Sequence, residues 1–301
     1  MHDIIYAKFR KISKVCKEYC KDLVDQRGNL RHRGVKSTKF SDVEVIALNI
    51  TAEILSIDSE NRLFHLLKNE YEKDFPNIIS RRSYNDRKKV LHVLTDRIRT
   101  SMSDKIDETE RCLCIDSKPL PICKPRRSQR VKFRAGIYEE DPDFGFCASQ
   151  NLYYKGYKLH CICGIRGVIH TFAITKASVH DMAFLKEMKY MVKDCTIIGD
   201  KGYISKEVQL DLFNSVNIRL EVPHRSNQTQ LSPLSKYSGR IRKRIETVFS
   251  QLSDQFMFIR NYAKGAKGFF TRILSKITAF TVSQYFNFIN HKPIDHVKYA
   301  I

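Results

Sequence analysis

The spacing of apolar residues changes near residue 110, and this change constrains the fold of the chain more than any other feature. Before it, apolar residues recur every three or four positions, as Ile5, Phe9 and Ile12 do, which is typical of amphipathic helices. After it, short apolar runs rich in β-branched residues are typical of strands. The pattern therefore predicts an all-helical domain over residues 1–105 and an α/β domain over residues 106–301.

Four helices are expected in the first domain. The first follows the stripe that begins at Ile5, and the second starts at the capping box Ser41-Asp42-Val43-Glu44, in which the serine and glutamate side chains bind each other's backbone N–H groups. The third runs from Glu60 to about residue 75, where Pro76 stops it. The fourth begins near residue 83 and continues to about residue 102.

The second domain alternates strands and helices in an order that favours a mixed sheet with helices on both faces. Strands are expected at residues 112–115, 154–164, 168–175, 195–199 and 218–222, and helices at residues 181–191, 206–215, 239–256 and 270–289. Residues 120–150 carry a basic run and then an acidic one, with Pro and Gly among them. We interpret that segment as a mobile surface loop.

The charge of the chain predicts a polyanionic partner. Its 53 Lys and Arg residues outnumber 33 Asp and Glu, which leaves a net charge of +20; nucleic acid is the first candidate and an anionic membrane surface the alternative. No apolar run reaches the roughly 18 residues that a membrane span needs. The N-terminal residues lack the apolar stretch and cleavage site of a secretory signal.

The cysteines indicate a reducing cytoplasm. Their number, nine, is odd, and they are scattered along the chain, unlike the framework of a secreted disulfide-rich protein. Two C-x-C pairs begin at Cys112 and Cys161, and His160 and His170 lie nearby, so a zinc site is one interpretation. Packing of the thiols in the core is the interpretation we favour, because C-x-x-C spacing is absent.

Two aspartates follow predicted strands. Asp116 comes after the run Cys112–Ile115, and Asp200 comes after the strand that ends at Gly199. Loops beyond the carboxyl ends of strands converge in sheets with βα connections, so these two side chains are expected to face each other. Like charges so close repel, and a divalent cation such as Mg²⁺, which prefers carboxylate oxygens, would relieve the repulsion.

Glu246 is the candidate for a third acid. It follows Ile245, which belongs to the apolar stripe of the predicted helix over residues 239–256, so it lies at the edge of the buried face. Arg242 precedes it by four residues on the same side. The alternative is an ordinary surface glutamate paired with Arg242 and Arg244.

The order of these residues resembles the DDE transposases of bacterial insertion sequences, and most closely insertion-sequence family 982. The stretches that carry the resemblance are CIDSKPL, YYKGYKLHCICGIRGVIHTFAITKASVHD, IIGDKGYIS, IRLEVPHRSNQ and RKRIETVFSQL, which span most of residues 111–256. The specific signature is IETVFSQL following a GDKGY block. SRRSYNDR in the helical region is a weaker marker.

The resemblance implies a ribonuclease-H-like fold in which the catalytic and metal-binding acids are Asp116, Asp200 and Glu246. It implies two Mg²⁺ ions, with Mn²⁺ able to substitute, and two reactions: hydrolysis at the transposon ends and attack of the freed 3′-OH on target DNA. The implied partner is double-stranded DNA, both the terminal inverted repeats and the target, and the protein is expected to bind it as a homodimer. No membrane partner is expected. The implied location is the bacterial cytoplasm, in association with the nucleoid.

The helix of the third acid departs from the family pattern. Related transposases often carry Tyr, Arg, Glu and Lys there; Arg242 and Glu246 fit, but Gly239 and Ser253 replace the Tyr and the Lys. Lys243, Arg244 and Arg260 are the candidates for the missing phosphate contacts. The segment between Asp200 and Glu246 is too short for a large inserted domain.

Several basic residues are candidates for holding DNA. The candidate DNA-binding residues are Arg81, Arg82, Arg87, Lys118, Arg126, Arg127, Lys201, Arg225, Arg242 and Lys243. The first three open the predicted fourth helix, suited to a DNA groove, and Arg126 and Arg127 belong to the basic run. The alternative is a solvated basic surface for Arg81, Arg82 and Arg87, and a polar turn for Arg225. For Lys118 and Lys201 it is a surface lysine that balances nearby acids. His180 and Asp181 are either outer groups of the metal site or a helix cap, and the cap is the reading we favour.

Other functions are compatible with parts of the pattern. A domesticated or inactive DNA-binding protein of the same fold would bind DNA without cutting it, but all three acids are present. A metal-dependent nuclease or junction resolvase of this fold would usually lack the helical front domain. An RNA-binding protein would fit the charge alone, and no aromatic-basic motif for single strands is evident.

Overall fold

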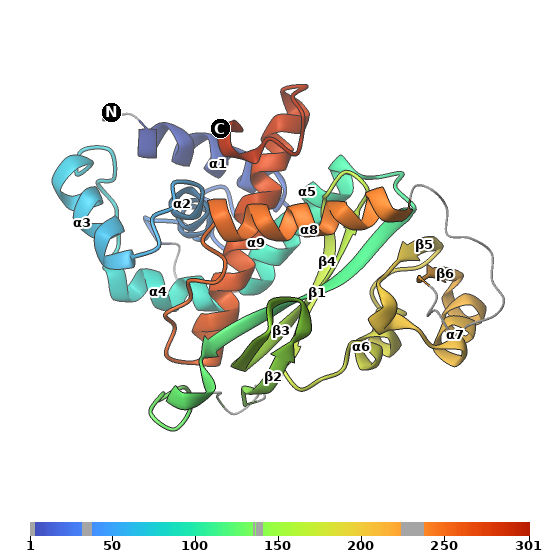
Figure 1. Cartoon of the computed structure of the whole chain (residues 1–301). Helices are drawn as coiled ribbons and strands as arrows, with labels where there is room; N and C mark the ends of the chain where they lie inside the picture. Colours follow the sequence, from blue (N-terminus) through green and yellow to red (C-terminus); the bar gives the residue numbers. More distant parts are fainter. Residues whose placement is uncertain (1–3, 32–37, 135, 137–140, 224–237) are drawn as a thin grey trace. The chain divides into compact units, whose positions relative to one another are not determined.

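The computed structural model describes residues 4–31, 38–134, 136, 141–223 and 238–301, and the chain forms two structural units. Unit 1 consists of residues 1–106, 252–263 and 267–301, and unit 2 of residues 107–251 and 264–266 (Figure 1). The boundary after residue 106 lies where the apolar spacing changes. Unit 1 thus combines the N-terminal residues with residues from the C-terminal part of the chain.

Unit 1 is helical, and its buried centre includes α2 and α9. Its helices are α1 (Ile4–Glu18), α2 (Asp42–Ile54), α3 (Glu60–Glu70), α4 (Arg81–Val90), α5 (His92–Ile106) and α9 (Ala266–Ile289). The capping box at Ser41 and Glu44 forms as expected. The predicted fourth helix is two helices, because α4 ends at Val90 with Leu91 as its C-cap. Helix α3 ends at Glu70, earlier than Pro76.

Buried polar contacts explain why α9 joins unit 1. Lys276, on α9, is fully buried and its ammonium donates to Glu53 of α2 at 2.7 Å and to the carbonyl of Phe256 at 2.7 Å. Asn49 donates to the hydroxyl of Ser275 at 2.6 Å. Buried charges are tolerated only when paired, so these contacts fix α9 against α2. No helix in the described part of the chain has both the length and the apolar character needed to cross a membrane.

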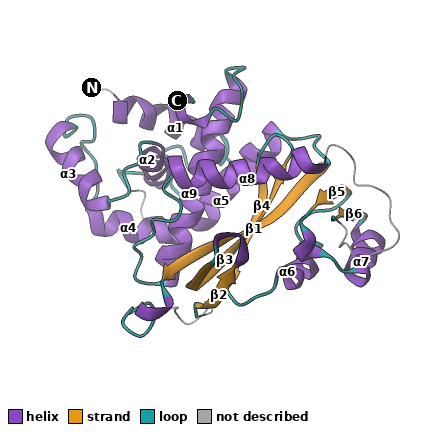
Figure 2. Ribbon diagram, viewed as in Figure 1, coloured by secondary structure: helices purple, strands orange, loops and turns teal. Residues whose placement is uncertain are grey.

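Unit 2 contains a mixed sheet, as the sequence predicts. Its described strands are β1 (Cys112–Cys123), β2 (Asp143–Cys147), β3 (Leu152–Gly164), β4 (Ile169–Lys176), β5 (Cys195–Ile198) and β6 (Ile218–Glu221). They lie in the order β2-β3-β1-β5-β6, with β4 also paired to β3 (Figure 2). The pairs β1–β3, β2–β3 and β3–β4 are antiparallel, and β1–β5 and β5–β6 are parallel.

The prediction of a mobile loop over residues 120–150 was wrong at both ends of that segment. β1 continues to Cys123, so Asp116 lies inside the strand rather than after it, and β2 occupies Asp143–Cys147. Proline usually interrupts a strand, but Pro119 and Pro121 each remove only one backbone N–H donor from the pairing of β1. Gly156 allows the close approach at this point, since a Cβ there would lie 2.3 Å from the Leu120 carbonyl oxygen.

Helices cover both faces of the sheet. On one face, Leu113, Ile115 and Ile162 pack in a core with α6 (Asp181–Met188) and α7 (Lys206–Val216). Because side chains alternate along a strand, Asp116 and Lys118 point to the other face. There the Lys118 ammonium lies 5.4 Å from the ring centroid of Phe249, on α8 (Ser238–Gln255).

Candidate active site

Asp116 is a mostly buried carboxylate on the central strand β1. Its Oδ1 accepts a hydrogen bond from the backbone N–H of Ser117 at 2.7 Å. Burial and, after it, the charges of Asp200, Asp181 and Glu246 together raise the pKa of Asp116 to about 7, despite that hydrogen bond. Four carboxylates from separate parts of the sequence are therefore close enough to interact.

The parallel pairing of β1 and β5 brings Asp200 to Asp116. Cys114 pairs with Ile198, so the two aspartates, each two residues further along its chain, lie at the same edge of the strand pair. The Asp200 carboxylate caps the short helix η3 (Lys201–Tyr203) by accepting from the Gly202 N–H at 2.6 Å. A Cβ at Gly202 would lie 2.9 Å from Asp200 Oδ1, so a glycine is favoured two residues after this acid.

Glu246 reaches this site from α8. Ile245 and Val248 are buried on this helix, whereas Glu246 is exposed, as its position at the edge of the apolar stripe predicts. Its charge contributes to the raised pKa of Asp116. Gly239 and Ser253, which stand where related enzymes carry Tyr and Lys, also lie in α8.

Asp181 is the fourth carboxylate near Asp116, whereas the sequence analysis favoured a helix-cap role for it. His180, not Asp181, caps α6, since its Nδ1 accepts from the N–H of Met182 at 3.2 Å. Asp181 instead accepts from the ammonium of Lys158 at 3.1 Å and lies 3.9 Å from His160 Nδ1. Lys158 and His160 are two residues apart on β3, a spacing that places both on one face and was visible in the sequence.

His160 is a neutral group beside this carboxylate. Burial and, to a smaller extent, the charge of Lys158 lower the pKa of His160 to about 4, although the charge of Asp181 acts in the opposite direction. The ring stacks on Phe184 at 4.3 Å between centroids, and its Nε2 lies 3.0 Å from the Thr175 hydroxyl. It therefore holds α6 against β3 without adding a positive charge near neutral pH.

The donors at this site fit a divalent cation that prefers oxygen. Carboxylates are the ligands that Mg²⁺ and Mn²⁺ prefer, and Asp116 is a mostly buried carboxylate that also feels the charges of Asp200, Asp181 and Glu246. Among the residues that the structure describes, no three His, Cys, Asp or Glu side chains already form a metal-binding group. The described cysteines are all free thiols.

The candidate DNA-binding residues occupy different environments. Arg81 and Arg82 are exposed in the first turn of α4, Arg126 and Arg127 in the short helix η1 (Pro125–Arg127), and Lys201 and Lys243 near the acids. Arg242 is partly buried on α8, and Lys118 is 9% exposed. Arg225 lies outside the described residues.

Arg87 has an intramolecular role. Its guanidinium lies 2.6 Å from the Asp42 carboxylate and 2.7 Å from the Phe40 carbonyl oxygen, and the Asp42 side chain is fully buried. A buried carboxylate requires such a partner. Arg87 therefore stabilises unit 1, and we leave it out of the proposed DNA contacts.

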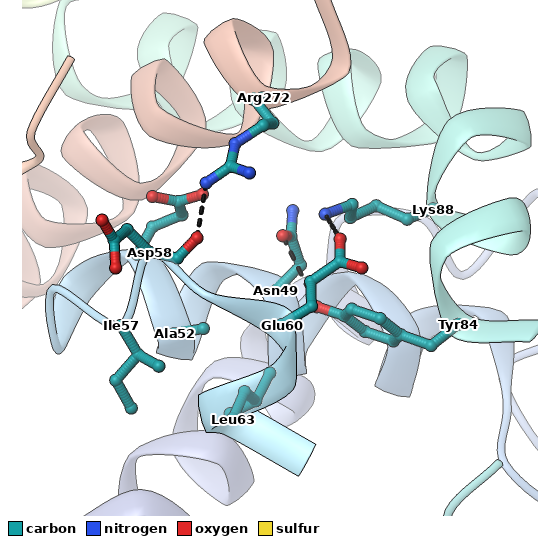
Figure 3. A pocket seen from close by; sticks show the side chains of 10 residues that line it. Asn49, Ala52, Ile57, Asp58, Glu60, Leu63, Tyr84, Lys88 and Arg272 are labelled. Carbon is teal, nitrogen blue, oxygen red and sulfur yellow. Dashed lines mark hydrogen bonds and ion pairs between the residues drawn. The ribbon is translucent and has the colours of Figure 1, made fainter. Parts of the chain in front are cut away.

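A small polar cavity in unit 1 is not a substrate site. Figure 3 shows Lys88 directed at Glu60 and Arg272 at Asp58; the first contact is an ion pair of 2.6 Å, and in the second Arg272 donates to the Asp58 carbonyl at 2.5 Å. The cavity between them has a volume of about 10 Å³, room for about one water molecule.

The comparison with protein families decides the affiliation of the chain. The model of the transposase DDE domain matches residues 107–282, more than half of the chain. The chain belongs to this transposase family. Searches of curated proteins and of solved structures found no match. The matched region of the transposase contains Asp116, Asp181, Asp200 and Glu246.

The raised pKa of Asp116 gives the transposase a testable dependence of stability on pH. The folded protein binds this proton more tightly than the unfolded chain, so ionised Asp116 destabilises the fold, fully above about pH 7 and progressively less below it. We expect Asp116→Asn to raise the melting temperature by about 3 °C or more at pH 8 without divalent metal, and by less at pH 5. Thermal unfolding followed by circular dichroism measures both values.

The matched control for this experiment is Asp211→Asn. Asp211 lies on α7 with half of its side chain exposed, 3.4 Å from the Lys189 ammonium, so its removal should leave the melting temperature nearly unchanged at both pH values. Equal melting temperatures for wild type and Asp116→Asn at pH 8 would show that the ionised Asp116 carboxylate does not destabilise the fold.

Proposed function

We propose that this transposase cleaves DNA at the ends of an insertion element of family 982 and joins the freed 3′-OH to target DNA. The observation that carries the proposal is the proximity of carboxylates from β1, the end of β5 and α8: the charges of Asp200 and Glu246 add to the burial that raises the pKa of Asp116. Acids from three separate elements serve no packing purpose at one edge of a sheet, because each repels the others. A site that binds divalent cations explains their presence.

Asp116, Asp200 and Glu246 are the residues that would hold Mg²⁺ or Mn²⁺. Two such ions, when bound, lower the pKa of the attacking water or 3′-OH and stabilise the leaving oxygen. Asp116 sits on the central strand between β3 and β5, and it would hold these ions together with Asp200 and Glu246. No protein nucleophile is required for either reaction.

Other residues of the chain would bind and orient the DNA. Lys201 follows Asp200 in η3 and is exposed, which suits contact with a phosphate beside the cut. Lys118, on the same strand face as Asp116, keeps its ammonium near the Phe249 ring and would offset the charge of the acids. Arg81, Arg82, Arg126, Arg127, Arg225, Arg242 and Lys243 are the further proposed DNA contacts.

The proposed setting is the cytoplasm of a bacterium, where a homodimer would pair the two terminal inverted repeats on the nucleoid. Pairing of two ends requires two active sites, and each chain supplies one set of acids. The net charge of +20 favours association with long DNA before a specific end is found.

One assay tests the proposal. The purified protein is incubated with Mg²⁺ or Mn²⁺ and DNA that carries the inverted repeats flanking its gene, and the products are scored for end cleavage and for joining to target DNA. Cleavage at the repeat ends followed by joining is the expected result. Specific binding of the ends without cleavage in either metal would overturn it and favour a DNA-binding protein of the same fold.

A further inference from the structure

Exposed aromatic side chains gather on the β2–β3 hairpin, away from the acids. Phe144 and Phe146 of β2 are each 49% exposed, and Tyr153 of β3 is 63% exposed. β2 is an edge strand of the sheet, where exposed apolar side chains invite aggregation unless they have a use.

The strand register places these rings in two pairs on one face. Phe146 lies opposite Tyr153, and Phe144 lies opposite Lys155. The rings of Phe146 and Tyr153 have centroids 4.3 Å apart with 30° between their planes, and the Lys155 ammonium lies 5.5 Å from the Phe144 centroid. The hairpin thus presents three aromatic rings and one cation side by side.

The other face of the hairpin is packed, which makes this arrangement rigid. A Cβ at Gly145, between the two phenylalanines, would lie 2.7 Å from the Cβ of Ala177. Gly145 therefore lets β2 lie directly against this residue. The rings are held on a fixed surface rather than on a loose turn.

This surface faces the same side of the sheet as Asp116. Asp116 pairs with Cys161 on β3, and alternation along β3 places Tyr153, Lys155 and Cys161 on one face. Cys161 lies six positions after Lys155 on β3, a distance of about 20 Å along an extended strand. A nucleic-acid strand that passes the acids can therefore extend to the rings.

A run of exposed cations begins beside the rings. Cys123 of β1 pairs with Lys155, and the chain then continues into exposed basic residues. These are Lys124, Arg126, Arg127, Arg130, Lys132 and Arg134. An apolar protein partner would not require so many positive charges at its edge, whereas a phosphate backbone would.

We propose that the β2–β3 hairpin binds single-stranded DNA next to the cut, with bases stacked on Phe144, Phe146 and Tyr153 and phosphates on Lys155 and the basic run. Aromatic rings bind bases of any sequence by stacking, and cations along a groove bind the backbone. The choice of DNA over RNA and the position next to the cut rest on the proposed function. The stacking surface itself does not.

The test measures binding of a fluorescently labelled 12-nucleotide thymidine oligomer and of a 20-base-pair duplex, by anisotropy and without divalent metal. The double variant Phe146→Ala/Tyr153→Ala should lose about tenfold or more in affinity for the oligomer and little for the duplex. Phe146→Leu/Tyr153→Leu, which keeps apolar bulk but removes the rings, should lose as much. Circular dichroism verifies that both variants are folded.

Tyr190→Ala is the matched control. Tyr190 is 77% exposed, and the Lys189 ammonium lies 5.6 Å from its ring centroid, so it has the same chemistry away from the hairpin. It should bind the oligomer as the wild type does. Unchanged oligomer affinity in the hairpin variants would overturn the proposal, as would full affinity in the leucine variant or a loss of dimerisation that accounts for the whole effect.

The outcome is independent of catalysis. The binding assay contains no metal, so it measures oligomer binding without any cleavage. A protein that binds the oligomer through the hairpin but never cuts DNA would refute the proposed function alone. A protein that cuts DNA with no contribution from the rings would refute only the inference about the hairpin.

Discussion

Asp116→Asn is expected to lower the rate of Mg²⁺-dependent end cleavage by at least about 10³-fold, the scale on which a group acting in the transition state contributes. The amide keeps the size of the carboxylate but has no negative charge to hold a cation. Specific binding of the end DNA should persist, because Asp116 repels phosphate rather than binding it. Single-turnover cleavage of end DNA measures the rate, and gel mobility measures the binding.

The other two acids should behave in the same way. Asp200→Asn and Glu246→Gln are expected to lose cleavage and keep DNA binding. Asp211→Asn, at a half-exposed side chain of α7, should cut at the wild-type rate. Replacing Mg²⁺ by Mn²⁺ should not restore Asp116→Asn. Wild-type cleavage by any one of the three site variants would remove that residue from the catalytic set.

The affinity for end DNA is expected to fall about 10³-fold or more between 50 and 200 mM salt. Six of the candidate contacts are exposed cations on described residues: Arg81, Arg82, Arg126, Arg127, Lys201 and Lys243. Each phosphate contact releases bound counterions from the DNA, and six to ten contacts produce a loss of this size. Equilibrium binding is measured over a series of salt concentrations. The slope of the logarithm of the binding constant against the logarithm of the salt concentration gives the number of phosphate contacts.

Variants assign part of this salt dependence to named residues. Arg126→Ala/Arg127→Ala should reduce the magnitude of the slope of log binding constant against log salt concentration by about two, since each phosphate contact contributes about 0.9. Lys189→Ala, which removes a cation 3.4 Å from the Asp211 carboxylate, should leave the slope unchanged. An affinity that is flat over this range of salt would contradict the electrostatic account of DNA binding.

The features that the sequence predicted are those encoded by local pattern. The capping box at Ser41, the alternation of strands and helices after residue 110, and the position of Asp200 just beyond a strand all depend on neighbouring residues. Glu246 follows the same logic, because the edge of an apolar stripe is visible from helical spacing alone.

The features that escaped prediction depend on contacts between distant segments. The continuation of β1 through Pro119 and Pro121 depends on Gly156, which lies on another strand. The packing of α9 against α2 depends on the pairing of Lys276 with Glu53, 223 residues away.

The environment of Asp181 was also hidden in the sequence. Its contact with Lys158 is formed only when β3 and α6 pack together, so a helix start and a site carboxylate look alike until the register of β3 is known. The aromatic surface was hidden for a related reason, since Phe146 and Tyr153 become neighbours only through the pairing of β2 with β3.

Binding of Mn²⁺ tests most directly whether Asp116, Asp200 and Glu246 together form a metal site. Electron paramagnetic resonance of Mn²⁺ titrated at pH 8 into the protein bound to end DNA counts the ions held, since phosphate completes the ligand shell of such ions. The wild type and Asp211→Asn should each hold two ions per chain, and Asp116→Asn should hold neither tightly. Equal stoichiometry and affinity in Asp116→Asn and the wild type would contradict the account.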